Sequence, residues 1–312
     1  MLKAFVFKPL SPFKSFPTTN TIFGAICWGI RWLESEEKLL ETLEMFKTGK
    51  PPFIISAPLP WKEGKKEGKW VFPRPIHFIR MTPENVEDYR RYKEFKKAQW
   101  VSWKVFREIL EKEPEESFQG EKPQINKDVI PHASINRLTM TTVGGELYNE
   151  EALWLSSFGV IVKFFDESFA PLVWACLEFS QLGGNKTTGM GRYMLEETEP
   201  PEGMEEFISQ KSTRAFLISD CFYDPEFDLK NSFYDIRVQK PAVENGLTKR
   251  VWKNTFCYLT PGSQVRVKTP KDWYGGIKEV LKEGSISVYQ YGIGFPLFAR
   301  WWPTVAILRS EV

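Results

Sequence analysis

A chain of 312 residues is long enough for about two domains, at roughly 150 residues per domain. Its residues are 42% hydrophobic and 15% aromatic, which excludes an intrinsically disordered chain because so much apolar surface can form a core. The net charge is only +2, which excludes a basic field over the whole molecule, so a nucleic acid would be bound by a local strip of cations.

Other classes of protein are excluded by the residue pattern. No apolar run reaches the roughly 18 residues of a membrane helix, and the first ten residues alternate in polarity, unlike a signal peptide. We therefore expect a cytoplasmic protein without membrane contact. The four cysteines show no C-x-x-C spacing and there are only two histidines, so we expect no metal site and no cofactor.

The periods of the apolar residues predict a mixture of strands and helices in the first 200 residues. In chain order, the pattern predicts a strand at Leu2–Lys8, helices at Thr21–Leu33 and Glu36–Lys47, strands at Phe53–Ala57 and Trp70–Arg74, one or two helices within Pro83–Lys112, a strand at Ala152–Phe165, a helix at Phe169–Leu182 and a strand at Arg192–Glu196. Thr18, Thr19 or Asn20 would cap the first helix, because their side chains can accept a hydrogen bond from a free helical N–H.

Three polar stretches separate these elements. Trp61–Lys69 is rich in lysine, glutamate and glycine, and predicts an exposed hairpin or loop. Glu111–Lys127 has few apolar residues and predicts a mobile loop. Pro131–Tyr148 carries a row of polar and hydroxyl side chains before a turn at Gly144-Gly145, and predicts a hairpin-like protrusion.

A stretch rich in glutamate and proline, Glu196–Glu206, predicts a boundary between a first domain (1–200) and a second (201–312). Strands dominate the second domain, with one helix expected at Trp273–Lys282 and a glycine turn at Gly292–Phe295. The strands expected there are Thr213–Phe222, Tyr234–Lys240, Leu247–Leu259, Gln264–Lys268, Ser285–Tyr291, Pro296–Arg300 and Val305–Arg309. The fold class is therefore α+β, and the element order of the first domain suggests a ferredoxin-like unit with large insertions.

The stretch Gly183–Tyr193 reads GGNKTTGMGRY and lies between the last helix and the last strand of the first domain. Its glycines permit positive φ angles and the close approach of another backbone, and successive N–H groups in such a loop can bind an anion. Lys186 and Arg192 add positive charge. From the residues alone, a loop that binds a phosphate backbone and a plain helix-to-strand turn are about equally favoured.

The motifs of common enzymes are absent from the sequence. The glycine-rich stretch lacks the G-x-x-x-x-G-K-[ST] spacing of a P-loop, and Met194 stands where a dinucleotide-binding G-x-G-x-x-G needs its third glycine. No serine lies in a G-x-S-x-G elbow. His77 lies in an apolar run and is expected to be a packed core or edge residue. His132 lies in the polar hairpin and is expected to contact RNA, with an acid–base role as the alternative.

Four stretches, taken together, resemble the RAMP superfamily of CRISPR effector proteins. They are the glycine-rich Gly183–Tyr193, the first-helix segment Thr18–Trp32, the N-R-x-T step within His132–Tyr148 and the second glycine-rich stretch Val288–Leu297. They occur in the order found in that family. Within the superfamily, the chain is similar over essentially its whole length to the family of fourth subunits of type III-A (Csm) effector complexes.

The resemblance implies two ferredoxin-like domains and a non-catalytic role in antiviral defence, in which the chain binds the 5′ tag of the CRISPR RNA (crRNA). It implies two partner proteins, the large polymerase-type effector subunit and the backbone RAMP subunit. The RNA-binding residues implied in the glycine-rich stretch are Gly183, Gly184, Lys186, Thr187, Thr188, Gly189, Gly191 and Arg192. Those implied in the polar hairpin are Asn136, Arg137 and Thr139, to which we add His132.

Two alternatives stand beside this prediction. The first is an RNA-processing endoribonuclease of the same superfamily, which would usually cut with a histidine close to the first strand and helix. Leu2–Leu33 contains no histidine, so Lys8 or Lys14 with a tyrosine would have to replace it. The second is an interaction protein in which the glycine-rich stretch only packs against a partner.

Overall fold

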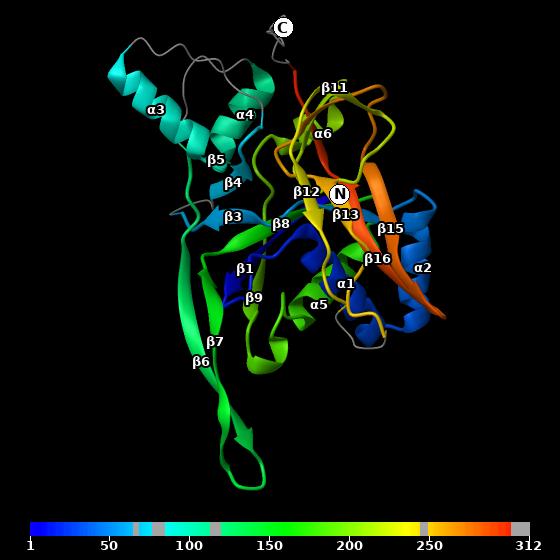
Figure 1. Cartoon of the computed structure of the whole chain (residues 1–312). Helices are drawn as coiled ribbons and strands as arrows, with labels where there is room; N and C mark the ends of the chain where they lie inside the picture. The colour runs from blue at the N-terminus through cyan, green and yellow to red at the C-terminus, as the bar shows by residue number, and fades with distance from the viewer. Residues whose placement is uncertain (65–68, 77–84, 113–119, 244–248, 301–312) are drawn as a thin grey trace, which may run out of the picture.

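The computed structural model describes residues 1–64, 69–76, 85–112, 120–243 and 249–300. It is an α+β protein whose largest sheet has seven strands in the order β5-β4-β3-β8-β1-β9, with β2 also paired to β8 (Figure 1). These strands are β1 (Leu2–Pro9), β2 (Phe53–Ile55), β3 (Leu59–Lys62), β4 (Lys69–Pro73), β5 (Trp100–Ser102), β8 (Phe158–Phe164) and β9 (Tyr193–Thr198).

The first strand lies in the interior of this sheet. β1 pairs antiparallel with both β8 and β9, so that Phe5 lies opposite Val160 on one side and Glu197 on the other. The residues from Ala4 to Phe7 are at most 1% exposed, because both faces of the strand are covered. The predicted first strand is therefore confirmed, and its alternating aromatic residues belong to the core.

The helices of the first half lie close to the predicted ranges. They are α1 (Thr19–Leu33), α2 (Glu36–Lys47), α3 (Val86–Lys97), α4 (Trp103–Glu111) and α5 (Phe169–Phe179), and α6 (Met204–Ser209) follows β9. Thr18 caps α1, since its hydroxyl accepts from the Thr21 N–H at 3.3 Å and its own N–H donates to the Thr21 hydroxyl. α1 packs closely along α5, as Gly29 shows: a Cβ at this position would lie only 2.4 Å from the Cys176 Cβ.

A long two-stranded hairpin projects from the body of the molecule (Figure 1). Its strands are β6 (Ile125–Asn136) and β7 (Thr141–Leu155). The predicted protrusion is confirmed, but the turn expected at Gly144-Gly145 is wrong, because these glycines lie within β7. The chain reverses at residues 137–140 instead, where the Asn136 side chain accepts main-chain hydrogen bonds and Met140 takes a φ of 55°.

Two further predictions fail at the base of this hairpin. The loop expected over Glu111–Lys127 ends early, because Ile125 already begins β6, while residues 113–119 lie outside the described residues. The single strand expected over Ala152–Phe165 is two strands. The chain leaves the hairpin after Leu155 and enters the main sheet at Phe158, so one apolar run serves two different sheets.

The second half of the chain consists mostly of strands, as predicted. A four-stranded sheet has the order β11-β14-β10-β17, and β12–β13 and β15–β16 form two hairpins. The strands are β10 (Arg214–Leu217), β11 (Phe227–Phe233), β12 (Ile236–Gln239), β13 (Phe256–Leu259), β14 (Gln264–Val267), β15 (Tyr274–Glu283), β16 (Ile286–Gly294) and β17 (Pro296–Phe298). β11 was not predicted, and the expected strand Val305–Arg309 lies outside the described residues, as does His77.

Two predictions about glycines in this half are wrong. The expected helix Trp273–Lys282 is the strand β15, in which Gly275 has a φ of 76° and pairs across to β16. In the expected turn at Gly292–Phe295, residues 292–294 belong to the strand β16, and a Cβ at Gly292 would lie 2.1 Å from the Phe222 ring. In both places the glycine permits close approach of a neighbour and does not reverse the chain.

One hydrophobic core includes residues from both halves of the chain. Its buried members include Phe5 and Ile26 from the first half and Phe216 and Tyr291 from the second. The Tyr291 hydroxyl accepts a hydrogen bond from the Ile55 N–H at 3.0 Å, so a buried polar contact also crosses between the halves. The division into domains 1–200 and 201–312 stays a prediction.

Candidate nucleic-acid interface

The glycine segment (Gly183–Tyr193) connects α5 to β9 and contains one short 3₁₀ turn, η1 (Lys186–Thr188). Four of its residues take left-handed backbone conformations: Gly183 (φ 87°), Asn185 (φ 60°), Gly189 (φ 90°) and Gly191 (φ 77°). Glycine adopts such angles without a steric penalty, and asparagine tolerates them better than most residues do. The positive φ angles expected from the sequence are therefore present.

The last part of the glycine segment is tied to the loop that follows β1. The Gly191 N–H donates to the Pro12 carbonyl at 2.9 Å, and the Leu182 N–H donates to the Gly191 carbonyl at 3.0 Å. The Arg192 N–H donates to the Ser11 hydroxyl at 2.9 Å. A Cβ at Gly191 would lie 2.0 Å from the Leu182 carbonyl oxygen, so only glycine fits at this position.

The first part of the glycine segment keeps its amides available. Within the described part of the chain, the N–H groups of Gly183 and Gly184 donate no hydrogen bond. Gly184 is exposed and lies against the side chain of Lys14, whose Cβ is 3.7 Å from the position of a Cβ on Gly184. Available N–H groups on a glycine backbone are suitable donors for an anion such as a phosphate.

Gly183, Gly184 and Lys186 form part of the wall of a groove of about 1130 Å³. The other walls come from α1, α2, the chain between β12 and β13, and the first part of β16 with the turn residue before it. The charged residues among its described lining are four cations and one carboxylate: Arg31, Lys186, Lys240, Lys253 and Glu36. Arg31 and Glu36 pair with each other at 2.9 Å, so the described lining keeps a net charge of +3, from Lys186, Lys240 and Lys253, which suits a polyanion.

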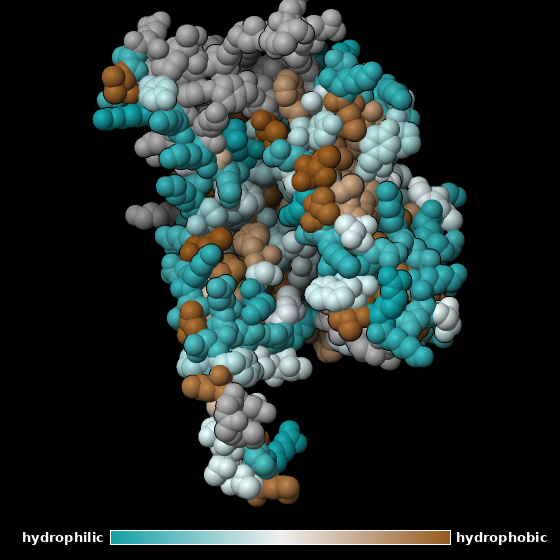
Figure 2. Space-filling model, in the orientation of Figure 1, coloured by the Kyte–Doolittle hydropathy of each residue, from teal (hydrophilic) through white to brown (hydrophobic). Residues whose placement is uncertain are grey.

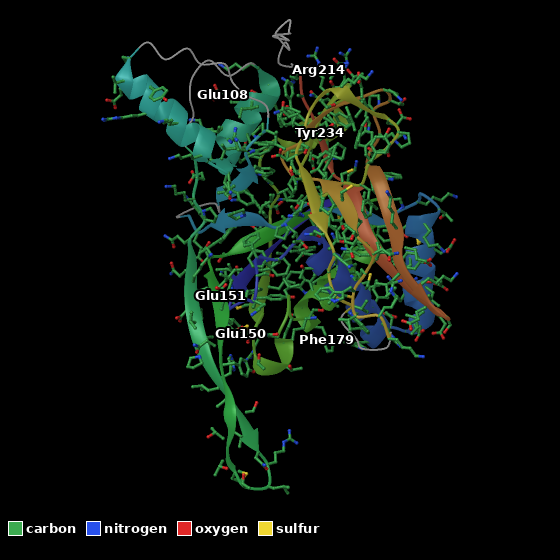
Figure 3. The ribbon with its side chains drawn as sticks, in the orientation of Figure 1. Glu108, Glu150, Glu151, Phe179, Arg214 and Tyr234 are labelled. Atoms are coloured by element: carbon green, nitrogen blue, oxygen red, sulfur yellow. The ribbon has the colours of Figure 1, made fainter. Side chains whose placement is uncertain are left out.

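Glu150 connects the glycine segment to the hairpin, near the hairpin's junction with the body (Figure 3). Its Oε1 accepts hydrogen bonds from the Lys14 Nζ at 2.9 Å and from the Asn185 Nδ2. Its Oε2 lies 3.5 Å from the His132 Nε2, and the side chain is only 13% exposed. One carboxylate thus joins the loop after β1, the glycine segment and both strands of the hairpin.

The contacts of Glu150 favour its ionised form. The hydrogen bond from Lys14 is the largest cause that holds the pKa of Glu150 below its ordinary value, and the hydrogen bond from Asn185 and the charges of Lys14 and His132 act in the same direction. Partial burial opposes them. Glu150 is therefore a carboxylate at neutral pH, and its negative charge holds Lys14 beside the glycine segment.

His132 lies on this inner part of the hairpin and not at its tip. Its ring stacks on the Tyr148 ring with centroids 5.3 Å apart, and its Nε2 is buried and faces Glu150. A general base has to reach the proton that it removes, and this nitrogen is turned away from solvent. The arrangement supports a role for His132 in the packing of the hairpin.

Asn136, Arg137 and Thr139 lie at the tip of the hairpin, well away from the glycine segment (Figure 1). The Asn136 Oδ1 accepts from the N–H groups of Leu138 at 2.9 Å and Thr139 at 3.3 Å, so its side chain stabilises the turn itself. Leu138 is 95% exposed and Met140 is 78% exposed, and apolar surface is visible at the tip in Figure 2.

Comparison with known proteins gives relatives along the whole chain, although no protein-family model matches it. Csm4 of the CRISPR system of Thermococcus onnurineus (strain NA1) is 23% identical in an alignment that covers 93% of this chain and 93% of that protein. A chain of the crystal structure of the Csm3–Csm4 subcomplex in the type III-A CRISPR-Cas interference complex has a TM-score of 0.61 at 21% identity, and the match covers 95% of this chain and 98% of that chain. A chain of the Csm1–Csm4 cassette in complex with cA4 has a TM-score of 0.60 at 18% identity, and the match covers 97% of this chain and 100% of that chain.

This chain has the Csm4 fold. The resemblance to that family, which was drawn from four short motifs, is confirmed by sequence and structural similarity over nearly the whole chain. A mixed α+β architecture dominated by antiparallel strands agrees with it.

The Csm4 fold brings only part of the predicted RNA-binding set together. Gly183, Gly184 and Lys186 line the groove. The other predicted residues of the segment lie outside the groove lining: Thr187, Thr188, Gly189, Gly191 and Arg192. His132 approaches the segment through Glu150, whereas the residues at the hairpin tip stand apart from it. That these residues bind RNA stays a prediction.

Three residues of this interface were missed as site residues. Glu150 belongs to a charged stretch of the sequence, Lys14 was considered only as a possible base, and Asn185 is the one polar residue of the GGNKTT run left out of the predicted set. No local sequence signal marks these residues as neighbours, because Lys14 lies 136 residues before Glu150 and Asn185 lies 35 residues after it. One sequence feature could have identified Asn185: asparagine tolerates a positive φ better than most residues do, and a glycine-rich run is where such φ angles are expected.

Two other kinds of site do not occur among the described residues. Within those ranges no helix is both long enough and apolar enough to cross a bilayer. Over the same ranges, no three histidine, cysteine, aspartate or glutamate side chains gather in a way that could hold a metal ion.

Proposed function

We propose that this chain is a Csm4-type subunit of a type III-A CRISPR complex that binds the 5′ tag of the crRNA without cutting it. The observation that carries the proposal is the positive groove, whose wall includes two glycine amides without a hydrogen-bond acceptor inside the described chain. Unpaired RNA is commonly held by its phosphates and 2′-hydroxyls where a backbone can approach closely. By analogy with Csm4 proteins, the biological setting that we propose is antiviral defence in the cytoplasm.

The proposed partners follow from the proteins that this chain resembles. Solved structures contain Csm4 together with Csm1 and together with Csm3. By analogy, this chain would contact a large polymerase-type subunit and a backbone RAMP subunit. Its own net charge of +2 is compatible with a subunit that binds only a few nucleotides while the assembly binds the rest.

The proposal includes two ferredoxin-like domains, 1–200 and 201–312. In the first, the strand order β9-β1-β8-β2 and the helices α1 and α5 correspond to the βαββαβ arrangement of such a domain. The material from β3 to β7 would then be an insertion that carries the hairpin. The glycine segment would occupy the connection between the second helix and the last strand.

RNA binding by the purified chain or complex tests the proposal. The double variant Lys186→Ala with Arg192→Ala should weaken binding of guide RNA by at least about tenfold, because a hydrogen bond to a charged group contributes roughly 1.5–3 kcal/mol. A control variant, Arg266→Ala with Lys271→Ala, removes the same charge from residues that lie outside both the groove lining and the glycine segment. Unchanged loading of the first variant would favour a segment that only packs against a partner.

The endoribonuclease alternative is less well supported by the candidate bases. The Lys8 Nζ donates a hydrogen bond to Glu196 at 2.6 Å, which raises the pKa of Lys8 and keeps this lysine protonated, so that it cannot accept a proton from RNA. Lys14 is held by Glu150, and the His132 Nε2 is buried. We expect no product when the protein is incubated with guide RNA precursor. Cleavage that His132→Ala abolishes would contradict the non-catalytic proposal.

A further inference from the structure

An exposed aromatic surface continues the groove beyond the glycine segment. Trp28 and Trp32 lie one turn apart on α1, with ring centroids 5.1 Å apart and planes at 28°. The Phe179 ring meets Trp32 edge to face at 5.9 Å, and the Arg31 guanidinium lies 5.6 Å from the centre of the Trp28 ring. We call Trp28, Arg31 and Trp32 the aromatic shelf.

The exposure of the aromatic shelf distinguishes it from the core. Trp32 is 59% exposed and Phe179 is 56% exposed (Figure 3 labels Phe179 at the end of α5), whereas Trp28 is half-buried and α1 buries Ile22, Ile26 and Ile30 completely. Packing within the described part of the chain therefore leaves much of the Trp32 and Phe179 surface uncovered. Large aromatic side chains that stay in water are commonly part of a binding surface.

The shelf is continuous with the groove. Trp28 and Arg31 line the same groove as Gly183, Gly184 and Lys186. Along α1, the groove lining runs from Thr18 to Arg31, and the ten residue steps from Thr18 to Trp28 span about 15 Å at a rise of 1.5 Å per residue. A ligand bound at the glycine segment could therefore extend along the helix to the tryptophans.

We propose that the aromatic shelf binds an unpaired nucleobase of the RNA strand whose phosphates contact the glycine segment. Single-stranded RNA is held where cations follow the backbone and aromatic or guanidinium planes stack on the bases, and both features meet here. The net positive charge of the described groove lining, four cations and one carboxylate, favours RNA over a protein helix as the occupant. This inference rests on the proposed RNA-binding function and adds a stacking site to it.

Binding of RNA oligonucleotides to the full-length protein tests the inference. The variants are Trp28→Leu and Trp32→Leu, and Tyr223→Leu is the control because Tyr223 is 54% exposed and does not line the groove. Each tryptophan variant should weaken binding of intact guide RNA by roughly 5- to 150-fold, whereas the control should not. One abasic nucleotide at the stacked position should weaken binding to the unchanged protein similarly, and should add little in the tryptophan variants.

The outcomes separate this inference from the function on which it rests. If the unchanged protein binds no guide RNA, the proposed function itself fails. If it binds RNA and both tryptophan variants bind equally well, the stacking site is wrong and the RNA-binding function stands. Loss of a co-purifying Csm1 or Csm3 chain with unchanged RNA affinity would assign the shelf to a protein partner and overturn the inference. Thermal unfolding of each variant checks that it is folded. If Trp28→Leu is unfolded, the RNA affinity of Trp32→Leu alone tests the stacking site.

Discussion

The glycine segment and the tip of the hairpin were both predicted to bind RNA, yet the two regions are built differently. The glycine segment is held by residues from distant parts of the chain, through Gly191 to Pro12 and through Asn185 to Glu150. In the described part of the chain, the tip is held by contacts among its own residues, chiefly through the side chain and the carbonyl of Asn136. A change that disturbs distant contacts should therefore damage the first region, and a change at the tip should leave the fold intact.

The largest effect is expected for Gly191→Ala. Both Gly191 and Gly189 have positive φ, but a Cβ at Gly191 would meet the Leu182 carbonyl oxygen at 2.0 Å, whereas a Cβ at Gly189 would have no atom within 4 Å. Gly189→Ala should lower the free energy of unfolding by about 1–2 kcal/mol from backbone strain alone. Gly191→Ala should lower it by more, as measured by chemical denaturation. Equal losses would mean that the close approach to Leu182 is not a constraint.

A smaller effect is expected for Glu150→Gln, which keeps the shape of the side chain and removes its charge. Lys14 and Asn185 would lose their charged acceptor, so residues 183–192 should exchange their amide hydrogens faster and the midpoint of thermal unfolding should fall. Glu151→Gln is the matched control, because Glu151 is exposed and no contact joins it to the glycine segment within the described chain (Figure 3). Equal rates of amide hydrogen exchange in the two variants would show that Glu150 does not link the hairpin to the glycine segment.

The difference in stability between the unchanged protein and Glu150→Gln should depend on pH. The pKa of Glu150 is lower in the folded protein than its ordinary value of 4.5, so the charge contributes stability above pH 4.5. That contribution is lost as the pH falls through the lowered pKa, where Glu150 becomes neutral like glutamine. Thermal unfolding midpoints of the two proteins should therefore converge in acid. A constant difference down to low pH would contradict this assignment of the charge.

The smallest effect on folding is expected at the hairpin tip. Leu138 is 95% exposed and only its N–H is used, as a donor to the Asn136 side chain, so Leu138→Ser should change the free energy of unfolding by no more than about 0.5 kcal/mol. Chemical denaturation provides the measurement. A decrease in the free energy of unfolding of more than about 1 kcal/mol would show that the tip packs against another part of the chain.

Prediction from the sequence succeeded where the signal was local. The alternating Leu2–Lys8 and the amphipathic Glu36–Lys47 formed the expected elements, because their periods match a strand and a helix. It failed where the partner was remote. Trp273–Lys282 carries charged and apolar residues that a helix would accept, but pairing with β16 made it a strand. The apolar run Ala152–Phe165 likewise contains no residue pattern that shows where the chain passes from the hairpin into the main sheet.

The amino-acid sequence by itself determined the α+β composition, the projecting hairpin, the left-handed glycines and the resemblance to the Csm4 family, since each depends on residues close together in the chain. Only the tertiary structure decided which polar groups meet. Lys14, Glu150 and Asn185 come from three separate segments, and the groove combines α1 with strands of the second half. Such contacts form when apolar faces of distant segments pack together, because this packing also brings their polar side chains together. The periodicity of the sequence does not predict which polar side chains will meet.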